Sequence, residues 1–122
     1  MSPVAAAKRE IPEAAQSVDL QYCHDYFESL FRTNFFKCLN DETRQKIILL
    51  AGQHGDEGMR VADIATHFDL DRTTISHHLA MLRDNNLLKL TKRGKERFYS
   101  VNVEYVIGVL EEVVRILKSC CR

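Results

Sequence analysis

The sequence predicts a mainly α-helical domain with one small β-hairpin. Five segments carry apolar residues at helical spacings of three and four, and two short segments alternate with the period of a strand. With 122 residues, of which 45% are apolar, the chain fits a single domain, and a second independent core would be hard to accommodate. We therefore expect one folded domain over residues 17–122, preceded by a flexible arm of residues 1–16 that is rich in Ala and polar residues.

Two helices are expected in the first part of the domain. Apolar residues recur at helical spacing from about Val18 to Leu39, which indicates one amphipathic helix. Asp41 then stands in a good capping position, so a second helix is expected from Glu42 to about Gln53. The run His54–Gly58 that follows is typical of a turn.

A short helix from about Val61 to Phe68 and a longer one from Arg72 to about Arg83 come next. About three residues join them, which is the length of the turn in a helix-turn-helix. Asp71 is a good N-cap for the longer helix. The apolar line that this helix is expected to bury consists of Ile75, Leu79 and Leu82.

A β-hairpin is expected after these helices. Residues 88–91 and 96–101 alternate with a period of two around the turn Lys92-Arg93-Gly94-Lys95. The last helix is expected from about Val103 to Cys121. A hairpin that directly follows a helix-turn-helix forms a wing, so the predicted fold is a winged helix-turn-helix.

The charge of the chain is unevenly distributed. The net charge is zero, yet seven Lys and Arg residues face only three acids between Asp71 and Ser100, a local charge of +4 that the rest of the chain balances with −4. Local asymmetry, rather than the total charge, determines where a polyanion is attracted. The helix-turn-helix and its hairpin are therefore the part of the chain where nucleic acid would bind.

The longer helix and the hairpin supply different candidate contacts with DNA. On the helix, small hydrogen-bonding side chains oppose the buried line, so they can reach base edges in a major groove. The cations of the hairpin suit phosphates beside the groove. A lone basic hairpin is more often a solvated loop, but its place after a helix-turn-helix favours DNA. The predicted contacts are Arg72, Thr73, Thr74, Ser76, His77, Lys92, Arg93, Lys95 and Arg97.

Several stretches together resemble one family of regulators. They are Cys38–Arg44, Val61–Ala65, Thr73–Leu79, Leu82–Leu87 and Arg93–Tyr99. Their order and spacing are similar to those of the ArsR/SmtB family of winged-helix repressors, over roughly residues 20–120. The resemblance implies an α-rich homodimer on an inverted-repeat operator of double-stranded DNA. It also implies release from DNA when a metal ion, a metalloid or a redox signal is sensed.

The last helix independently predicts a dimer. One apolar line runs along it, and further apolar residues, among them Tyr105, Val109 and Ile116, lie on roughly the opposite side. A helix that is apolar nearly all round must be buried on more than one face. In so small a chain a second subunit is the expected cover, so we predict a homodimer formed through the first and last helices. The apolar line comprises Val103, Ile107, Leu110, Val114, Leu117 and Cys121.

The known sensor sites of the family do not match this chain. The paired cysteines of the soft-metal site align with Arg60 and Ala62, and no histidine for a zinc site on the last helix occurs after His78. The cysteine that sulfide- or oxidant-responsive members often carry late in the second helix is also absent, since that region reads Ile47–Ala51. Any sensing residues must therefore be found among the four cysteines that the chain does have.

We predict that Cys120 and Cys121, with Cys23 or Cys38 as a third ligand, respond to a thiol-reactive signal. Three sulfurs would suit arsenite or another soft ion as the inducer, and oxidation of the same thiols is the alternative. Cys23 and Cys38 lie on apolar stripes, where cysteine often serves only as a small buried hydrophobe. In a cytoplasmic protein the thiols are expected to be reduced. No other cofactor is expected.

Composition excludes other classes. No run approaches the roughly 18 apolar residues of a membrane span, and the start of the chain does not have the pattern of a signal peptide, so we expect a cytoplasmic location. The acid and His pairs do not combine with a nucleophile in one cleft, so an enzyme is not expected. The sequence predicts a sequence-specific transcriptional repressor. The alternatives are a winged-helix regulator without a metal site and a winged helix that binds proteins instead of DNA.

Overall fold

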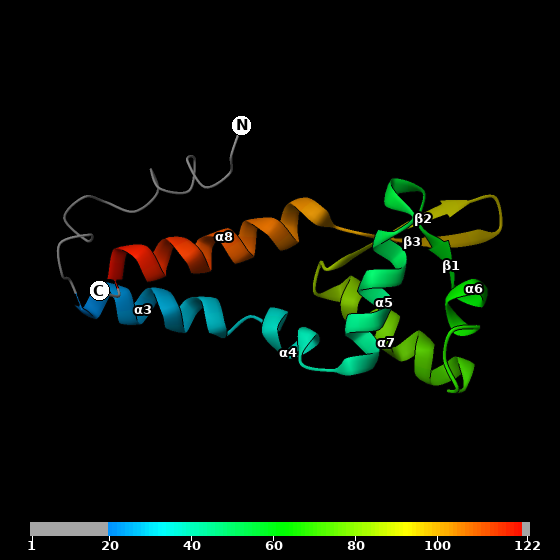
Figure 1. The fold of residues 1–122 in the computed structure, drawn as a ribbon, viewed down its shortest axis with the longest axis horizontal. Helices are drawn as coiled ribbons and strands as arrows, with labels where there is room; N and C mark the ends of the chain where they lie inside the picture. The colour runs from blue at the N-terminus through cyan, green and yellow to red at the C-terminus, as the bar shows by residue number, and fades with distance from the viewer. Residues whose placement is uncertain (1–19, 121–122) are drawn as a thin grey trace. The chain divides into compact units, whose positions relative to one another are not determined.

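The computed structural model describes residues 20–120, so the predicted arm of residues 1–16 lies outside the described residues. The chain divides into two compact units (Figure 1). The central unit comprises Asn34–Val103, and the described part of the terminal unit comprises residues 20–33 and 104–120.

The central unit contains four α-helices, which are α4 (Phe35–Leu39), α5 (Glu42–Gly52), α6 (Val61–Ala65) and α7 (Arg72–Asp84). Two of them, α5 and α7, begin at a side-chain cap. Both predicted caps are confirmed. The carboxylate of Asp41 accepts the backbone N–H of Arg44 at 2.9 Å, and that of Asp71 accepts the backbone N–H of Thr74 at 2.7 Å. Each carboxylate therefore satisfies one of the free N–H groups of the first turn.

A three-stranded antiparallel sheet completes the central unit, with the strand order β1-β3-β2. The predicted hairpin is confirmed as β2 (Leu88–Arg93) and β3 (Glu96–Val101), which close around a turn where Gly94 has a φ of +64°. Strand β1 (Met59–Arg60) pairs with β3 and was not predicted, because two residues cannot display an alternation. Gly58 permits this pairing, since it has a φ of +73° and a Cβ there would lie 2.4 Å from the carbonyl oxygen of Tyr99.

The core of the central unit lies between the helices and the sheet. The apolar line predicted for α7 is confirmed, since Ile75, Leu79 and Leu82 are each 0% exposed. The other buried apolar residues of this unit are Phe35, Cys38, Ile47, Ala51, Met59, Ile64, Leu87, Leu88 and Tyr99. Packing of α7 against this core leaves its opposite face at the surface.

The described part of the terminal unit consists of two antiparallel helices, α3 (Leu20–Phe31) and α8 (Val103–Cys120), which lie side by side (Figure 1). The prediction of one helix from Val18 to Leu39 is wrong, because α3 ends at Phe31 and α4 begins at Phe35. At the break the hydroxyl of Thr33 donates to the carbonyl oxygen of Leu30 at 2.9 Å. Such local bonds from a side chain to the backbone compete with the continuation of a helix.

A disulfide and a group of polar contacts join α3 to α8. A disulfide links Cys23 to Cys120 across a Cα–Cα distance of 5.8 Å. The hydroxyl of Tyr26 donates to the carboxylate of Glu112, which also pairs with Arg115. The expectation of reduced thiols is therefore wrong for Cys23 and Cys120 in this structure. The packing of α3 on α8 brings these two sulfurs together from positions 97 residues apart, a proximity that no local sequence pattern records.

Candidate nucleic-acid interface

The exposed N-terminal half of α7 holds five of the predicted contacts. Arg72, Thr73, Ser76 and His77 are exposed, whereas Thr74 is half-buried. Hydrogen bonds from the backbone N–H and the hydroxyl of Thr74 lower the pKa of the Asp71 carboxyl, so this cap is ionised at neutral pH. The polar side chains that remain at the surface can donate to and accept from base edges.

The wing, residues 92–97, divides its cations between two faces. Lys92 is the cross-strand partner of Arg97, and Arg93 is the partner of Glu96. Neighbouring pairs in a sheet point to opposite faces, so Lys92 and Arg97 share one face while Arg93 and Glu96 share the other.

Arg93 anchors the wing to the body of the central unit. Its guanidinium lies 3.6 Å from the centroid of the Phe98 ring and donates to the carbonyl oxygen of Glu57 at 2.5 Å. These contacts hold the arginine over the sheet. Among the predicted wing cations, Arg93 is therefore the one with a clear structural role.

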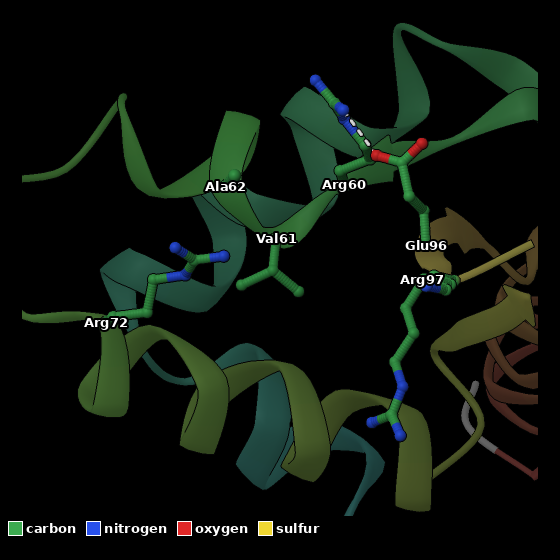
Figure 2. Close-up of a pocket in the computed structure, with 7 residues that line it drawn as sticks. Arg60, Val61, Ala62, Arg72, Glu96 and Arg97 are labelled. Atoms are coloured by element: carbon green, nitrogen blue, oxygen red, sulfur yellow. Dashed lines mark hydrogen bonds and ion pairs between the residues drawn. The ribbon is translucent and has the colours of Figure 1, made fainter.

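A pocket of about 290 Å³ lies between the start of α6, the start of α7 and the wing (Figure 2). Figure 2 shows Arg72 and Arg97 on either side of Val61, with Arg60 directed toward Glu96. The structure thus brings together three of the predicted contacts, Arg72, Lys95 and Arg97, whereas the others lie elsewhere on α7 and the wing. The full lining is Arg60, Val61, Ala62, Arg72, Lys95, Glu96 and Arg97.

Arg60 is a residue of this pocket that the DNA-contact prediction did not include. Its side chain donates to Asp63 at 3.0 Å and to Glu96 at 2.5 Å, and it is 44% exposed. Hydrogen bonds to Asp63 and then to Glu96 raise the pKa of Arg60, and Arg60 in turn lowers the pKa of Asp63. The spacing of Arg60 and Asp63 at i and i+3 is the signal in the sequence that could have identified this pair.

The cysteines fall into both units. Cys38 is 0% exposed in the central unit, and its burial raises the pKa of its thiol. Cys23 and Cys120 belong to the terminal unit as a disulfide, and Cys121 lies outside the described residues. Within residues 20–120, the side chains close enough to share a metal ion are those of the exposed His24, Asp25 and Glu28, rather than the cysteines.

Comparison with known proteins identifies the class of this chain. The model of the bacterial regulatory protein arsR family matches residues 41–89. The chain is 41% identical over 70 residues to the transcriptional repressor SdpR of Bacillus subtilis, covering 57% of this chain and 73% of SdpR. It is 40% identical over 73 residues to the arsenical resistance operon repressor of Escherichia coli, covering 60% of this chain and 61% of that repressor, less than two thirds of its length.

A similar solved structure is the ArsR-like transcriptional regulator from Rhodococcus sp. RHA1, with a TM-score of 0.58 and 28% identity over 66% of this chain and 72% of that chain. The fold and the relatives define a DNA-binding transcriptional regulator of the winged-helix class, and not an enzyme. The chain belongs to the ArsR family. The predicted family and fold class are therefore confirmed. Among residues 20–120, no helix is long and apolar enough to cross a membrane.

Proposed function

We propose that this protein is a sequence-specific repressor that binds an inverted-repeat operator as a homodimer and leaves it in response to a thiol-reactive signal. The observation that carries the proposal is the exposed polar face of α7 beside the cationic pocket and the wing. In this arrangement α7 enters a major groove, and the wing contacts phosphates beside it. A two-fold dimer would place the two copies of α7 about one helical turn apart, roughly 34 Å.

A comparison of helix and wing variants tests this division of roles. Replacing Thr73, Ser76 or His77 with Ala should relax the preference for the operator, by about 1–3 kcal/mol for each base that the variant no longer reads. Replacing Lys92 or Lys95 with Gln should weaken all duplexes alike and reduce the salt slope by about 1. Titrations of operator and mixed-sequence DNA at several salt concentrations distinguish the two effects. If the α7 variants and the wing variants changed DNA binding in the same way, this division of roles would be refuted.

The exposed face of α8 supports the homodimer. Five apolar side chains on one side of this helix are 41–52% exposed, whereas Ile116 on the other side is 0% exposed. Ile116 therefore packs within the chain and is not available to a second subunit. A second subunit is the cover that a contiguous apolar line on a regulator of this size calls for. The five residues are Val103, Ile107, Leu110, Val114 and Leu117.

The disulfide between Cys23 and Cys120 supports a redox form of the signal. Oxidation of the two thiols forms the S–S bond and gives two protons and two electrons to an oxidant, for example a peroxide that is reduced to water. In the reduced form, Cys23, Cys120 and Cys121 could instead bind arsenite or another soft ion. The two responses exclude each other, because a sulfur in the disulfide is not available as a thiolate ligand.

A release titration separates these responses. DNA-bound protein, first reduced, is titrated with arsenite, cadmium, zinc, a persulfide donor and a peroxide. The double variant Cys120→Ser, Cys121→Ser should lose the response, and Cys38→Ser, which removes a thiol buried in the central unit, is the matched control. An unchanged response in the double variant would place the sensor elsewhere. No response in the wild type would favour a regulator without a metal or redox site.

A winged helix that binds only proteins is the second candidate function. Retention on immobilised duplex DNA that falls as the salt concentration rises would exclude it, because such salt dependence reports the release of counterions from phosphates.

A further inference from the structure

Arg60 connects the wing to the helix-turn-helix. It lies at the end of β1, and its side chain bonds at the same time to Asp63 of α6 and to Glu96 of β3, 36 residues further along the chain. We propose that Arg60 is a positioning residue, and that the bridge it forms builds a pocket for one phosphate group of the DNA backbone. This inference rests on the proposed function, because its ligand is the DNA that the regulator binds.

The charges of the pocket assign different roles to its arginines. The guanidinium of Arg60 forms ion pairs with two carboxylates, those of Asp63 and Glu96. Arg72, Lys95 and Arg97 line the same pocket and supply cations for a bound anion. Arg60 therefore neutralises the acid that the pocket contains, while the other three cations face the phosphate. The first turn of α7, where Arg72 lies, adds the partial positive charge of a helix N-terminus.

The lining of the pocket favours a phosphate group over a whole small molecule. Small-molecule sites are mostly lined by apolar side chains. This pocket instead has four cationic residues, one acid and only two small apolar side chains in its lining. It joins the first turn of α7 to the wing, the two elements proposed to contact one DNA duplex.

The bridge explains how the wing and α7 can share one phosphate. Lys95 and Arg97 come from the wing and Arg72 comes from α7, so all three reach the same group only if the wing keeps its position. The contact from Arg60 to Glu96 holds the end of β3 that lies next to the turn. Without this contact the wing cations would still be present, but they would lose one of the contacts that hold them beside Arg72, and the anchor at Arg93 would remain.

Glu96→Gln separates positioning from simple charge. If charge alone mattered, removing an acid from a DNA-binding surface would tighten binding. If Arg60 acts by positioning, the same substitution weakens binding despite the gain in positive charge, by about two- to fivefold when one exposed ion pair is broken. The matched control is Asp56→Asn in the exposed 3-10 turn Gly55–Glu57, which changes the charge equally and should leave binding unchanged or slightly tighter.

The experiment uses the full chain and a fluorescent mixed-sequence duplex, with binding measured at several salt concentrations. In a cycle with Arg60→Gln, the double variant should bind no more weakly than Arg60→Gln alone, because both substitutions break the same bridge. Hydrogen exchange of the wing amides without DNA should be faster in Glu96→Gln than in Asp56→Asn, which tests positioning separately from affinity.

The outcomes discriminate between the two proposals. If the wild type shows no salt-dependent binding to the duplex, the proposed function fails. If the wild type binds but Glu96→Gln binds as tightly as Asp56→Asn, with unchanged exchange of the wing amides, DNA binding stands and the role of Arg60 is refuted. Weaker binding together with faster exchange supports the bridge.

Discussion

In the central unit, apolar side chains fill the interior, and the ion pair of Arg60 and Glu96 lies at the surface, where the two side chains are 44% and 50% exposed. The terminal unit instead buries the arginine of one ion pair and exposes one apolar line. Arg115 is 1% exposed, pairs with Glu112 and donates to the hydroxyl of Tyr26, whereas the apolar line on the outer face of α8 is 41–52% exposed.

This contrast shows that the two units are stabilised in different ways. The central unit buries enough apolar surface to form a core by itself and presents charge to its surroundings. The terminal unit has only two described helices, so a disulfide and a buried ionic cluster hold them together. Its remaining apolar face is of the kind that a second subunit covers. Substitutions should therefore have large effects on stability in the terminal unit and small ones at the surface of the central unit.

The largest effect is expected from the disulfide. A cross-link over 97 residues restricts the unfolded chain by about 4–5 kcal/mol in the chain-entropy model. Cys23→Ser should therefore lower the free energy of unfolding by about 4 kcal/mol under oxidising conditions. Denaturant titrations with and without a reducing agent measure this change. The reducing agent should destabilise the wild type and leave Cys23→Ser unchanged, and equal responses of the two proteins would contradict the prediction.

The next effect concerns Arg115. Arg115→Met leaves Glu112 without the cation beside it, and breaking a buried pair in this way typically costs about 3–5 kcal/mol. Glu112 is partly exposed, so we expect a decrease of about 3 kcal/mol in the free energy of unfolding. The double variant Arg115→Met, Glu112→Leu should recover most of it, because it removes both charges.

The control for Arg115 is Lys118→Met, an exposed cation on the same helix, for which we expect a change within about 0.5 kcal/mol. Chemical denaturation of the three variants measures these differences. If Arg115→Met and Lys118→Met lowered the free energy of unfolding equally, burial would not determine how much the pair of Arg115 and Glu112 stabilises the protein.

These elements also show what can be predicted from the sequence. The α7 helix and the hairpin were predicted because their signals are local: the cap Asp71, the buried line and the turn at Gly94. The disulfide depends on the packing of residues far apart in the chain. Arg115 was not predicted as a buried residue, since a charged residue in a helical pattern normally marks the solvent face.

The candidate site shows the same division between local and non-local signals. The exposed residues at the start of α7 follow from helical periodicity, and the wing cations follow from the alternation of strands. The pocket could not be predicted, because Arg60 meets Glu96 only through the pairing of β1 with β3. A strand of two residues is too short to leave a pattern, so neither this pairing nor the bridge can be read from periodicity.

A third prediction tests the outer face of α8. Leu110→Glu should weaken self-association by about 2 kcal/mol or more, because it places a charge at the centre of the proposed contact. The matched control is Leu49→Glu on α5, a leucine that is 69% exposed but lies outside this face. Sedimentation equilibrium of both variants and the wild type measures the effect. A monomeric wild type, or equal dissociation of both variants, would refute the dimer through this face.

The smallest effect is expected from a half-buried charge of the central unit, the cap Asp41. The backbone N–H of Arg44 lowers the pKa of the Asp41 carboxyl in the folded protein. Its contribution to stability is therefore fully present above the ordinary pKa of about 3.9 and is lost as the pH falls through the lowered folded value. Asp41→Ala should cost about 1 kcal/mol near neutral pH, as for other caps.

Asp41→Asn is the informative variant, because its amide keeps an oxygen acceptor for the Arg44 N–H but cannot titrate. Its stability should lie close to that of the wild type at neutral pH, and the difference should shrink as the pH falls below about 4, where the wild-type carboxyl becomes protonated. Asp63 and Asp71 also have lowered pKa values, so both proteins lose stability in acid and only the difference between their curves reports Asp41. Thermal unfolding from pH 7 to pH 3 measures that difference. A gap that stays constant over this range would show that the cap acts through its hydrogen bond alone, and that its charge adds nothing at this surface.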